Sequence, residues 1–116
     1  MVKTHQTDEF TRYLIDRLQP MGPVIAKKMF GCYGLFIEGL MFALVADDVL
    51  YLKADKKSAA VFQANNLPPF SYSKKGKTIC LNYFQSPDEL LENDSELIDW
   101  ANQAFSCALN SHGVSK

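Results

Sequence analysis

The residues of this 116-residue chain best able to carry covalent chemistry are three cysteines, Cys32, Cys80 and Cys107, and two histidines, His5 and His112. A thiol beside an imidazole can act as a nucleophile activated by a general base. Both histidines, however, lie near the chain ends, where neither side chain can be held reliably within hydrogen-bond distance of a thiol. The cysteines are odd in number and form no CxxC pair, so we expect free thiols in a reducing compartment.

Cys32 is the thiol with the strongest claim to reactivity, because it follows Gly31 in a turn that enters a strand. The alternative is a small residue that fills space in the core, and the sequence favours this interpretation. Cys80 alternates with apolar neighbours along a strand, and Cys107 lies off the main apolar stripe of the last helix. We therefore expect no catalytic residue, and a protein that is not an enzyme.

The acidic residues that might hold a metal ion are better explained by local structure. Asp47-Asp48, Asp88-Glu89 and the acids of segment 94–96 fall at turns and helix starts. Two histidines and three scattered thiols lack the spacing of zinc ligands. The segments GCYG and KGK match neither a dinucleotide fingerprint nor a Walker pattern. The sequence therefore predicts no metal site and no cofactor.

Lysines are the remaining residues with a recognisable chemistry, which is contact with phosphates. Residues 1–77 carry eleven Lys and Arg against seven Asp and Glu, whereas residues 78–116 carry one lysine and six acids. If two lysine groups lie at one sheet edge, they form a basic patch beside an exposed Tyr72 that would contact nucleic acid or a partner. The candidate contact residues are Lys27, Lys28, Lys74, Lys75 and Lys77. For any single lysine, the favoured alternative is protection of a sheet edge from aggregation.

The number of these lysines limits what they can do. Five or six lysines without a recognition helix supply only non-specific, salt-sensitive DNA affinity, with a Kd of about 10⁻⁴–10⁻⁶ M. Arginine, the commonest reader of bases, occurs only at Arg12 and Arg17, and no helix-turn-helix pattern is visible. The sequence thus favours a small adaptor that contacts another protein over an independent sequence-specific DNA binder.

A long apolar stretch, residues 29–46, must position these groups, and it contains one charged residue, Glu38. A membrane-spanning helix needs about 20 predominantly apolar residues, whereas three glycines interrupt this stretch. Short strands over 34–37, 40–45 and 49–53, joined by turns at 38–39 and 46–48, fit it better. Strand 40–45 is apolar on both faces, which predicts a central strand covered on both sides. We expect no membrane segment and a cytoplasmic location, since the N-terminus also lacks a secretory signal.

Capping residues and apolar spacing predict three helices around these strands. The first is expected to start at the cap Thr7 and to end at the segment PMGP, residues 20–23, which cannot continue a helix. Asp55 is expected to cap a short middle helix that ends near residues 65–66. A last helix is expected to start around residues 93–95, with an apolar stripe at 3.6-residue spacing.

A second hairpin is predicted between the middle and last helices. Its strands cover residues 70–73 and 78–84, and Lys75-Gly76 forms its turn. Ser86, Pro87 and Glu89 then match a capping box, which predicts a brief helical turn over residues 88–92. The predicted fold class is α+β: an antiparallel sheet, made of a meander plus a hairpin, packed with an N-terminal, a short middle and a C-terminal helix.

These elements form one expected domain, residues 1–116, with loose ends at about 1–6 and 111–116. An exposed edge of the sheet would support a homodimer.

Three segments of the chain carry a family resemblance: MFGCYGLFIEGLMFALVADDVLYLKAD, PFSYSKKGKTICLNYF and SPDELLEN. They resemble the N-terminal domain of the TfoX/Sxy family of bacterial regulators of natural competence, over roughly Phe10 to Ala108. The resemblance implies co-activation of competence genes together with the cyclic-AMP receptor protein and RNA polymerase. Cys32 departs from the pattern, since the family usually has a glycine there. Longer members also carry a separate helical C-terminal domain, for which 116 residues leave no room.

Two functions are therefore expected as alternatives. The first is a non-enzymatic regulator that acts mainly through protein contacts, with weak non-specific DNA contact. The second is a stand-alone module that binds a ligand or a protein and has no transcriptional role. A buried pocket with mixed polar and aromatic walls would favour the second.

Overall fold

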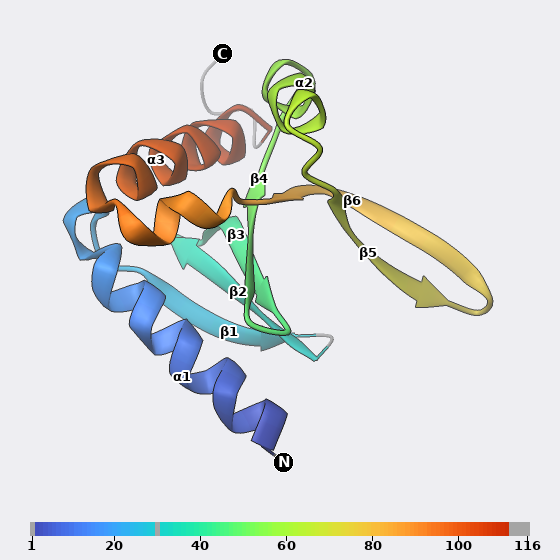
Figure 1. Cartoon of the computed structure of the whole chain (residues 1–116), viewed down its shortest axis with the longest axis horizontal. Helices are drawn as coiled ribbons and strands as arrows, with labels where there is room; N and C mark the ends of the chain where they lie inside the picture. The colour runs from blue at the N-terminus through green and yellow to red at the C-terminus, as the bar shows by residue number, and fades with distance from the viewer. Residues whose placement is uncertain (1, 30, 112–116) are drawn as a thin grey trace.

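A computed structural model describes residues 2–29 and 31–111, with side chains from residue 9 onward. Three α-helices, two 3₁₀ helices and six strands alternate along this part of the chain (Figure 1). In chain order they are α1 (Val2–Arg17), η1 (Gln19–Met21), β1 (Ile25–Met29), β2 (Cys32–Ile37), β3 (Leu40–Ala46), β4 (Val49–Lys53), α2 (Lys56–Ala64), β5 (Pro69–Lys74), β6 (Lys77–Gln85), η2 (Asp88–Glu92) and α3 (Asp94–Ser111).

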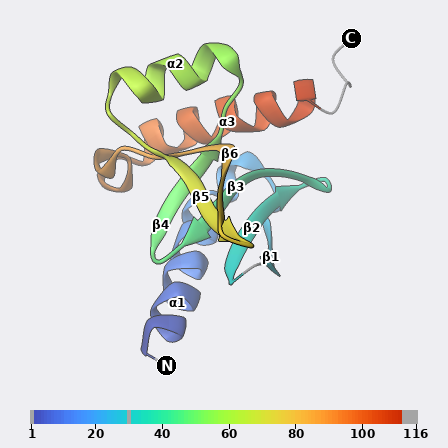
Figure 2. The ribbon, with the colours of Figure 1, turned by 90° about the vertical axis from the view of Figure 1, so that its right-hand side faces the viewer.

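The strands form one antiparallel sheet in the order β1-β2-β3-β4-β6-β5. The first four are a meander, whereas β6 pairs with β4 and leaves β5 at the edge. Helices α1 and α3 lie on the same side of this sheet, and α2 lies alongside α3 (Figures 1 and 2). The α+β fold class and the three helices predicted from sequence are thus confirmed. None of the described helices is both long enough and apolar enough to cross a membrane.

Strand β3 is the centre of the sheet, as predicted. Phe42, Ala43 and Val45 belong to the main core cluster, while Leu44 is buried outside it, so both faces of the strand are covered. A bulge interrupts the strand, because Leu35 pairs with Ala43 and Phe36 with Met41, which leaves Phe42 as the extra residue. The extra residue allows the Phe42 ring to meet Phe105 of α3 edge-on, with centroids 6.3 Å apart.

Two of the helix starts follow the sequence prediction. Asp55 caps α2 through a capping box: its Oδ1 accepts from the Ser58 backbone N–H at 2.8 Å, and its own N–H donates to Ser58 Oγ at 2.9 Å. Asn93 Oδ1 accepts from the backbone N–H of Glu96 at 3.0 Å, at the predicted start of α3. Short polar side chains satisfy the free N–H groups of a first helical turn in this way.

One other predicted helix start and one predicted cap are wrong. Helix α1 begins at Val2, ahead of the expected cap Thr7, because no glycine or proline interrupts the preceding residues. Residues 2–6 are therefore helical in their backbone, whereas residues 112–116 of the expected loose C-terminus lie outside the described part. The brief helical turn predicted over residues 88–92 is confirmed as η2, but Ser86 forms no capping box. Pro87 precedes η2 without a side-chain cap, and the Ser86 N–H donates instead to Leu50 O of β4 at 2.9 Å.

Candidate functional site

The two groups of candidate lysines lie on opposite edges of the sheet. Lys27 and Lys28 belong to β1, while Lys74, Lys75 and Lys77 flank the β5–β6 turn. Because β1 and β5 are the two edge strands, the single-edge basic patch proposed from the sequence does not form. All five lysines are exposed, and their role in contacting a partner stays a prediction.

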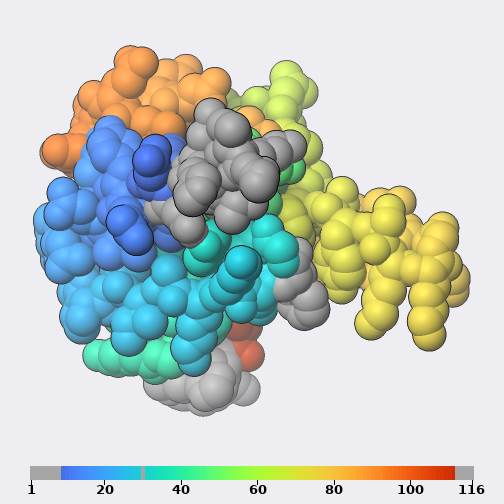
Figure 3. Space-filling view, turned by 90° about the horizontal axis from the view of Figure 1, so that it is seen from below, coloured from blue at the N-terminus to red at the C-terminus, as the bar shows by residue number. Residues whose placement is uncertain are grey.

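The lysines of the second group stand at the tip of a projecting arm, the β5–β6 hairpin of residues 69–85 (Figures 1 and 3). Lys75 and Gly76 have φ values of 53° and 80°, as a type I′ turn requires at its two central positions. The arm carries three lysines and no acidic residue. It therefore places three positive charges on a narrow two-stranded ribbon away from the body of the protein.

Aromatic contacts join the arm to the body at its base. The Phe70 ring meets Tyr51 of β4 in a T-shaped contact, with centroids 5.2 Å apart, and lies 6.3 Å from the Tyr72 ring. Tyr72 is half-buried, so the exposed tyrosine expected beside the lysines is wrong. Tyr72 lies opposite Ile79 of β6, and a cross-strand pair of an aromatic and a β-branched residue stabilises the hairpin.

Lys27 takes part in packing at the other sheet edge. Its Nζ lies 5.1 Å from the centroid of the Phe36 ring on β2, a geometry in which the ammonium group is attracted to the aromatic face. Residue 28 is an exposed lysine on the same edge strand. This arrangement supports the edge-protecting role for the first lysine group.

None of the described thiol environments is that of an activated nucleophile. Cys32 is buried, its thiol donates to Met29 O at 3.1 Å, and burial raises its pKa. This agrees with the space-filling interpretation. Cys80 is exposed, as expected on a strand where it faces away from its apolar neighbours. The imidazoles of His5 and His112, the only candidate bases, lie outside the described side chains.

Cys107 departs from the sequence prediction, which placed it off the apolar stripe of α3. It is only 7% exposed, and its Sγ lies 3.7 Å from Ser58 Oγ of α2. Burial raises the pKa of this thiol. A single helix pattern cannot show this burial, because it is α2 that covers Cys107. Across residues 2–29 and 31–111, no three His, Cys, Asp or Glu side chains are grouped so as to hold a metal ion.

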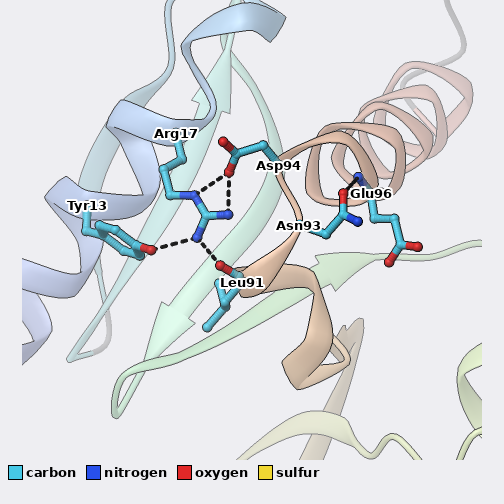
Figure 4. A network of polar contacts seen from close by, with 6 residues as sticks. All are labelled: Tyr13, Arg17, Leu91, Asn93, Asp94 and Glu96. Atoms are coloured by element: carbon cyan, nitrogen blue, oxygen red, sulfur yellow. Dashed lines mark hydrogen bonds and ion pairs between the residues drawn. The ribbon is translucent and has the colours of Figure 1, made fainter.

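A polar network that sequence reasoning missed links α1 to the start of α3 (Figure 4). The Arg17 guanidinium donates from Nε to Asp94 Oδ1 at 2.9 Å, and from Nη1 to Tyr13 Oη at 2.7 Å and to Leu91 O. Burial alone would lower the pKa of Arg17, but its contacts with Asp94 and Tyr13 raise it above the usual value. Arg17 thus has a structural task, and the sequence showed only that it lies on the first helix.

Acidic residues gather away from the arm. Residues 88–99, which form η2 and the first part of α3, contain six acids and no lysine or arginine. In Figure 3 this part of the chain, in orange, lies on the opposite side of the body from the tip of the arm, in yellow. The charge difference seen along the sequence is therefore also a separation in space.

Comparison with known proteins relates this fold to a family. Residues 16–108 match the TfoX N-terminal domain. The chain is 29% identical over 92 residues to Protein Sxy of Escherichia coli, covering 79% of this chain and 44% of that protein. It is 27% identical over 102 residues to DNA transformation protein TfoX1 of Aliivibrio fischeri, covering 88% of this chain and 47% of that protein. The chain thus spans less than half the length of these two relatives. The match to most of the chain shows that it belongs to the TfoX N-terminal domain family.

Proposed function

We propose that this protein is a non-enzymatic regulator of natural competence, which acts in the bacterial cytoplasm mainly through protein contacts. The observation that carries the proposal is the family match over residues 16–108, together with a relative named for DNA transformation. The proposed partners are the cyclic-AMP receptor protein and RNA polymerase. The lysines at the tip of the arm add a weak, non-specific contact with DNA.

The separation of charge supports such a bridging role. The acidic segment 88–99 offers a surface that attracts a basic region of a partner protein, whereas the arm offers lysines to phosphates. Because the two lie on opposite sides of the body, one partner does not block the other. A protein of this kind can hold a DNA-bound partner while its arm touches the neighbouring duplex.

The size of the DNA contribution follows from the number of lysines. Each phosphate neutralised contributes a slope of about −0.9 to a plot of log affinity against log salt. Three lysines therefore predict a slope of about −2.7, which is a loss of roughly 40-fold in affinity between about 50 and 200 mM salt. That contribution is too small for specific binding by the arm alone, so the protein contact must select the site.

The arm can be tested by anisotropy of a labelled duplex of random sequence, titrated at several salt concentrations. The triple variant Lys74→Gln, Lys75→Gln, Lys77→Gln is expected to lose most of the salt dependence. The double variant Lys27→Gln, Lys28→Gln is the matched control on the other sheet edge and is expected to keep the slope. An unchanged slope in the triple variant, or an equal loss in the control, would refute DNA contact through the arm.

The regulatory role needs a separate test in a competence-forming bacterium that lacks its own copy of this gene. Expression of the protein is expected to raise transcription from a competence promoter, and the purified protein is expected to retain the cyclic-AMP receptor protein or RNA polymerase on a column. If the reporter stays at its basal level and neither protein is retained, the proposed function is wrong. The triple arm variant should weaken the transcriptional response without reducing retention of the protein partner.

A further inference from the structure

One face of the arm has no role in the lysine contacts proposed above. Residues that lie directly opposite one another in an antiparallel pair point to the same side of the ribbon. Ser73 pairs with Thr78. Two residues further from the tip, Ser71 pairs with Cys80 on the same side. All four side chains are exposed. The arm thus presents an open strip of small side chains, which we call the hydroxyl face.

The opposite face of the arm carries its apolar and its charged side chains. The pair formed by Tyr72 and Ile79 lies on this face and is half-buried. Lys74 and Lys77 form the pair on the same face nearest the tip, and Lys75 lies in the turn. Because strand residues alternate between the two sides, the lysines of both strands point away from the hydroxyl face and leave it uncovered.

The free part of the arm is long enough to enter a groove of duplex DNA. Strand β6 returns to the body at Asn82, whose carbonyl oxygen accepts from the Ala54 N–H at 2.8 Å. The paired segments beyond this point are Ser71–Lys74 and Lys77–Cys80. At about 3.3 Å per residue, they extend roughly 13 Å from the body, as the yellow arm in Figures 1 and 3 shows. The major groove of B-form DNA is about 8.5 Å deep, so the arm can reach the base edges.

Charge and width together indicate which duplex and which groove fit the arm. The arm carries three lysines and no acidic residue, so it is attracted to a polyanion. The major groove of B-form DNA, about 12 Å wide, admits a two-stranded β-ribbon, whereas the minor groove is only about 6 Å wide. The major groove of an A-form RNA duplex is too deep and narrow for side chains to read. The major groove of B-form DNA is therefore the groove that matches the arm.

We propose that the arm inserts its hydroxyl face into the major groove of B-form DNA, while Lys74, Lys75 and Lys77 contact the phosphates on either side. This inference rests on the proposed DNA contact of the arm and adds the geometry of that contact. Serine and threonine hydroxyls both donate and accept, so they can pair with the edges of different bases. They favour particular sequences only weakly, and the protein partner still selects the site.

Methylation of DNA by dimethyl sulfate distinguishes the two grooves, because guanine N7 lies in the major groove and adenine N3 in the minor groove. The protein is added to a short duplex at about 50 mM salt, at a concentration that saturates binding in anisotropy. We expect the protein to reduce methylation of guanine N7 and to leave methylation of adenine N3 unchanged. Protection of adenine N3 instead, or protection of neither atom at saturation, overturns insertion into the major groove.

Cys80 reports on the hydroxyl face from the side of the protein, because it is an exposed thiol on that face. Saturating DNA is expected to slow its alkylation by iodoacetamide at least about fivefold. An RNA duplex of the same length and sequence carries a similar phosphate charge but is expected to slow the reaction less than about twofold. Equal protection of Cys80 by the two duplexes would show that the arm contacts phosphates without entering the groove, and would overturn the proposal.

An uncharged substitution tests the hydroxyl face without touching the lysines. Ser73→Leu places a bulky side chain on this face, and Ser106→Leu is the matched change at an exposed position of α3. In anisotropy, Ser73→Leu is expected to weaken DNA binding about fivefold or more, because it blocks entry into the groove. It should keep the salt slope of about −2.7, since the lysines remain. Ser106→Leu is expected to change the affinity less than about twofold. Equal affinities of the two variants would contradict insertion.

These measurements separate failure of the insertion from failure of the proposed DNA contact. If the triple lysine variant keeps the salt slope of the parent protein, the arm does not contact DNA and both ideas are wrong. If the slope depends on the lysines but guanine N7 stays fully reactive, only the insertion into the major groove is wrong. Lysine-dependent binding together with protection of guanine N7 and of Cys80 supports both.

Discussion

Arg17 offers the sharpest test of how the helices are held together. Its side chain is only 12% exposed, and it joins α1 to the segment that opens α3 through Asp94 and the Leu91 carbonyl. Arg17→Met keeps much of the buried stem but removes every donor. The substitution therefore leaves Leu91 O without its guanidinium partner and breaks the ion pair with Asp94 in one step.

Most of the expected loss in the free energy of unfolding comes from the buried end of this network, at the Leu91 carbonyl. Asp94 is 81% exposed, so its ion pair is screened by water and contributes about 0.5–1 kcal/mol. Leaving the half-buried Leu91 carbonyl unpaired costs about 1–2 kcal/mol. Together these predict a decrease of roughly 1.5–3 kcal/mol in the free energy of unfolding. For a chain of this length, that corresponds to a fall of about 10 °C in Tm.

Urea and thermal unfolding followed by circular dichroism measure both quantities. Arg12→Met, on the exposed face of the same helix, is the matched control and should change stability by less than about 0.5 kcal/mol. Asp94→Asn should cost about 1 kcal/mol or less, because it removes only the exposed partner. The reasoning fails if Arg17→Met lowers the free energy of unfolding no more than Arg12→Met does. It also fails if Asp94→Asn destabilises the protein as much as Arg17→Met does.

Three further predictions concern the sheet and the thiols. Gly34→Val is expected to lower the free energy of unfolding, measured in urea, by about 1–3 kcal/mol. The Cβ atom alone of any residue placed there would lie 2.7–2.9 Å from three neighbouring side-chain atoms. Iodoacetamide at neutral pH should label the exposed Cys80 first, whereas the buried Cys32 and Cys107 should react only when the protein unfolds. Peptide mass spectrometry measures the labelling of each cysteine. Fast labelling of Cys32 would contradict its space-filling role. Burial raises the pKa of Tyr83 to about 12 in the folded protein, whereas the pKa of an exposed tyrosine in the unfolded chain is about 10. The stability that the un-ionised Tyr83 gives the folded protein is therefore complete below pH of about 10. It is lost as pH rises toward 12, because the unfolded chain ionises first. Unfolding measured across that window should show a loss of about 2–3 kcal/mol in the native protein that is absent in Tyr83→Phe.

The strands were predictable because their ends are marked locally. Glycine and aspartate accept the turn conformations that end a strand, and Glu38, Asp47 and Asp48 do have positive φ values in the structure. The cap of α2 was also predictable, since Asp55 needs only a neighbour three residues away. Strand ends and helix caps that depend only on residues a few positions apart can be predicted from a single sequence.

Features decided by distant pairing could not be predicted in the same way. Ser86 has the sequence pattern of a helix cap, yet its N–H is taken by Leu50 in β4. Cys107 is buried by α2, which lies more than forty residues earlier in the chain. The basic patch failed for the same reason, since β6 pairs with β4 and so leaves β5 and β1 on opposite edges. Local propensity yields to tertiary contacts in each case.

The strand order also explains why the arm can carry a function that the rest of the sheet cannot. Strand β6 pairs with β4 only over Tyr83–Gln85, so its first half and all of β5 extend past the meander. Residues of that extension need not fill a core, which leaves Lys74, Lys75 and Lys77 free of any packing requirement. Lys27, by contrast, lies over Phe36, and changing it alters sheet packing as well as charge. A lysine at the tip of the arm can therefore be exchanged with an effect on phosphate contact alone. The salt slope of the arm variant consequently measures function rather than stability.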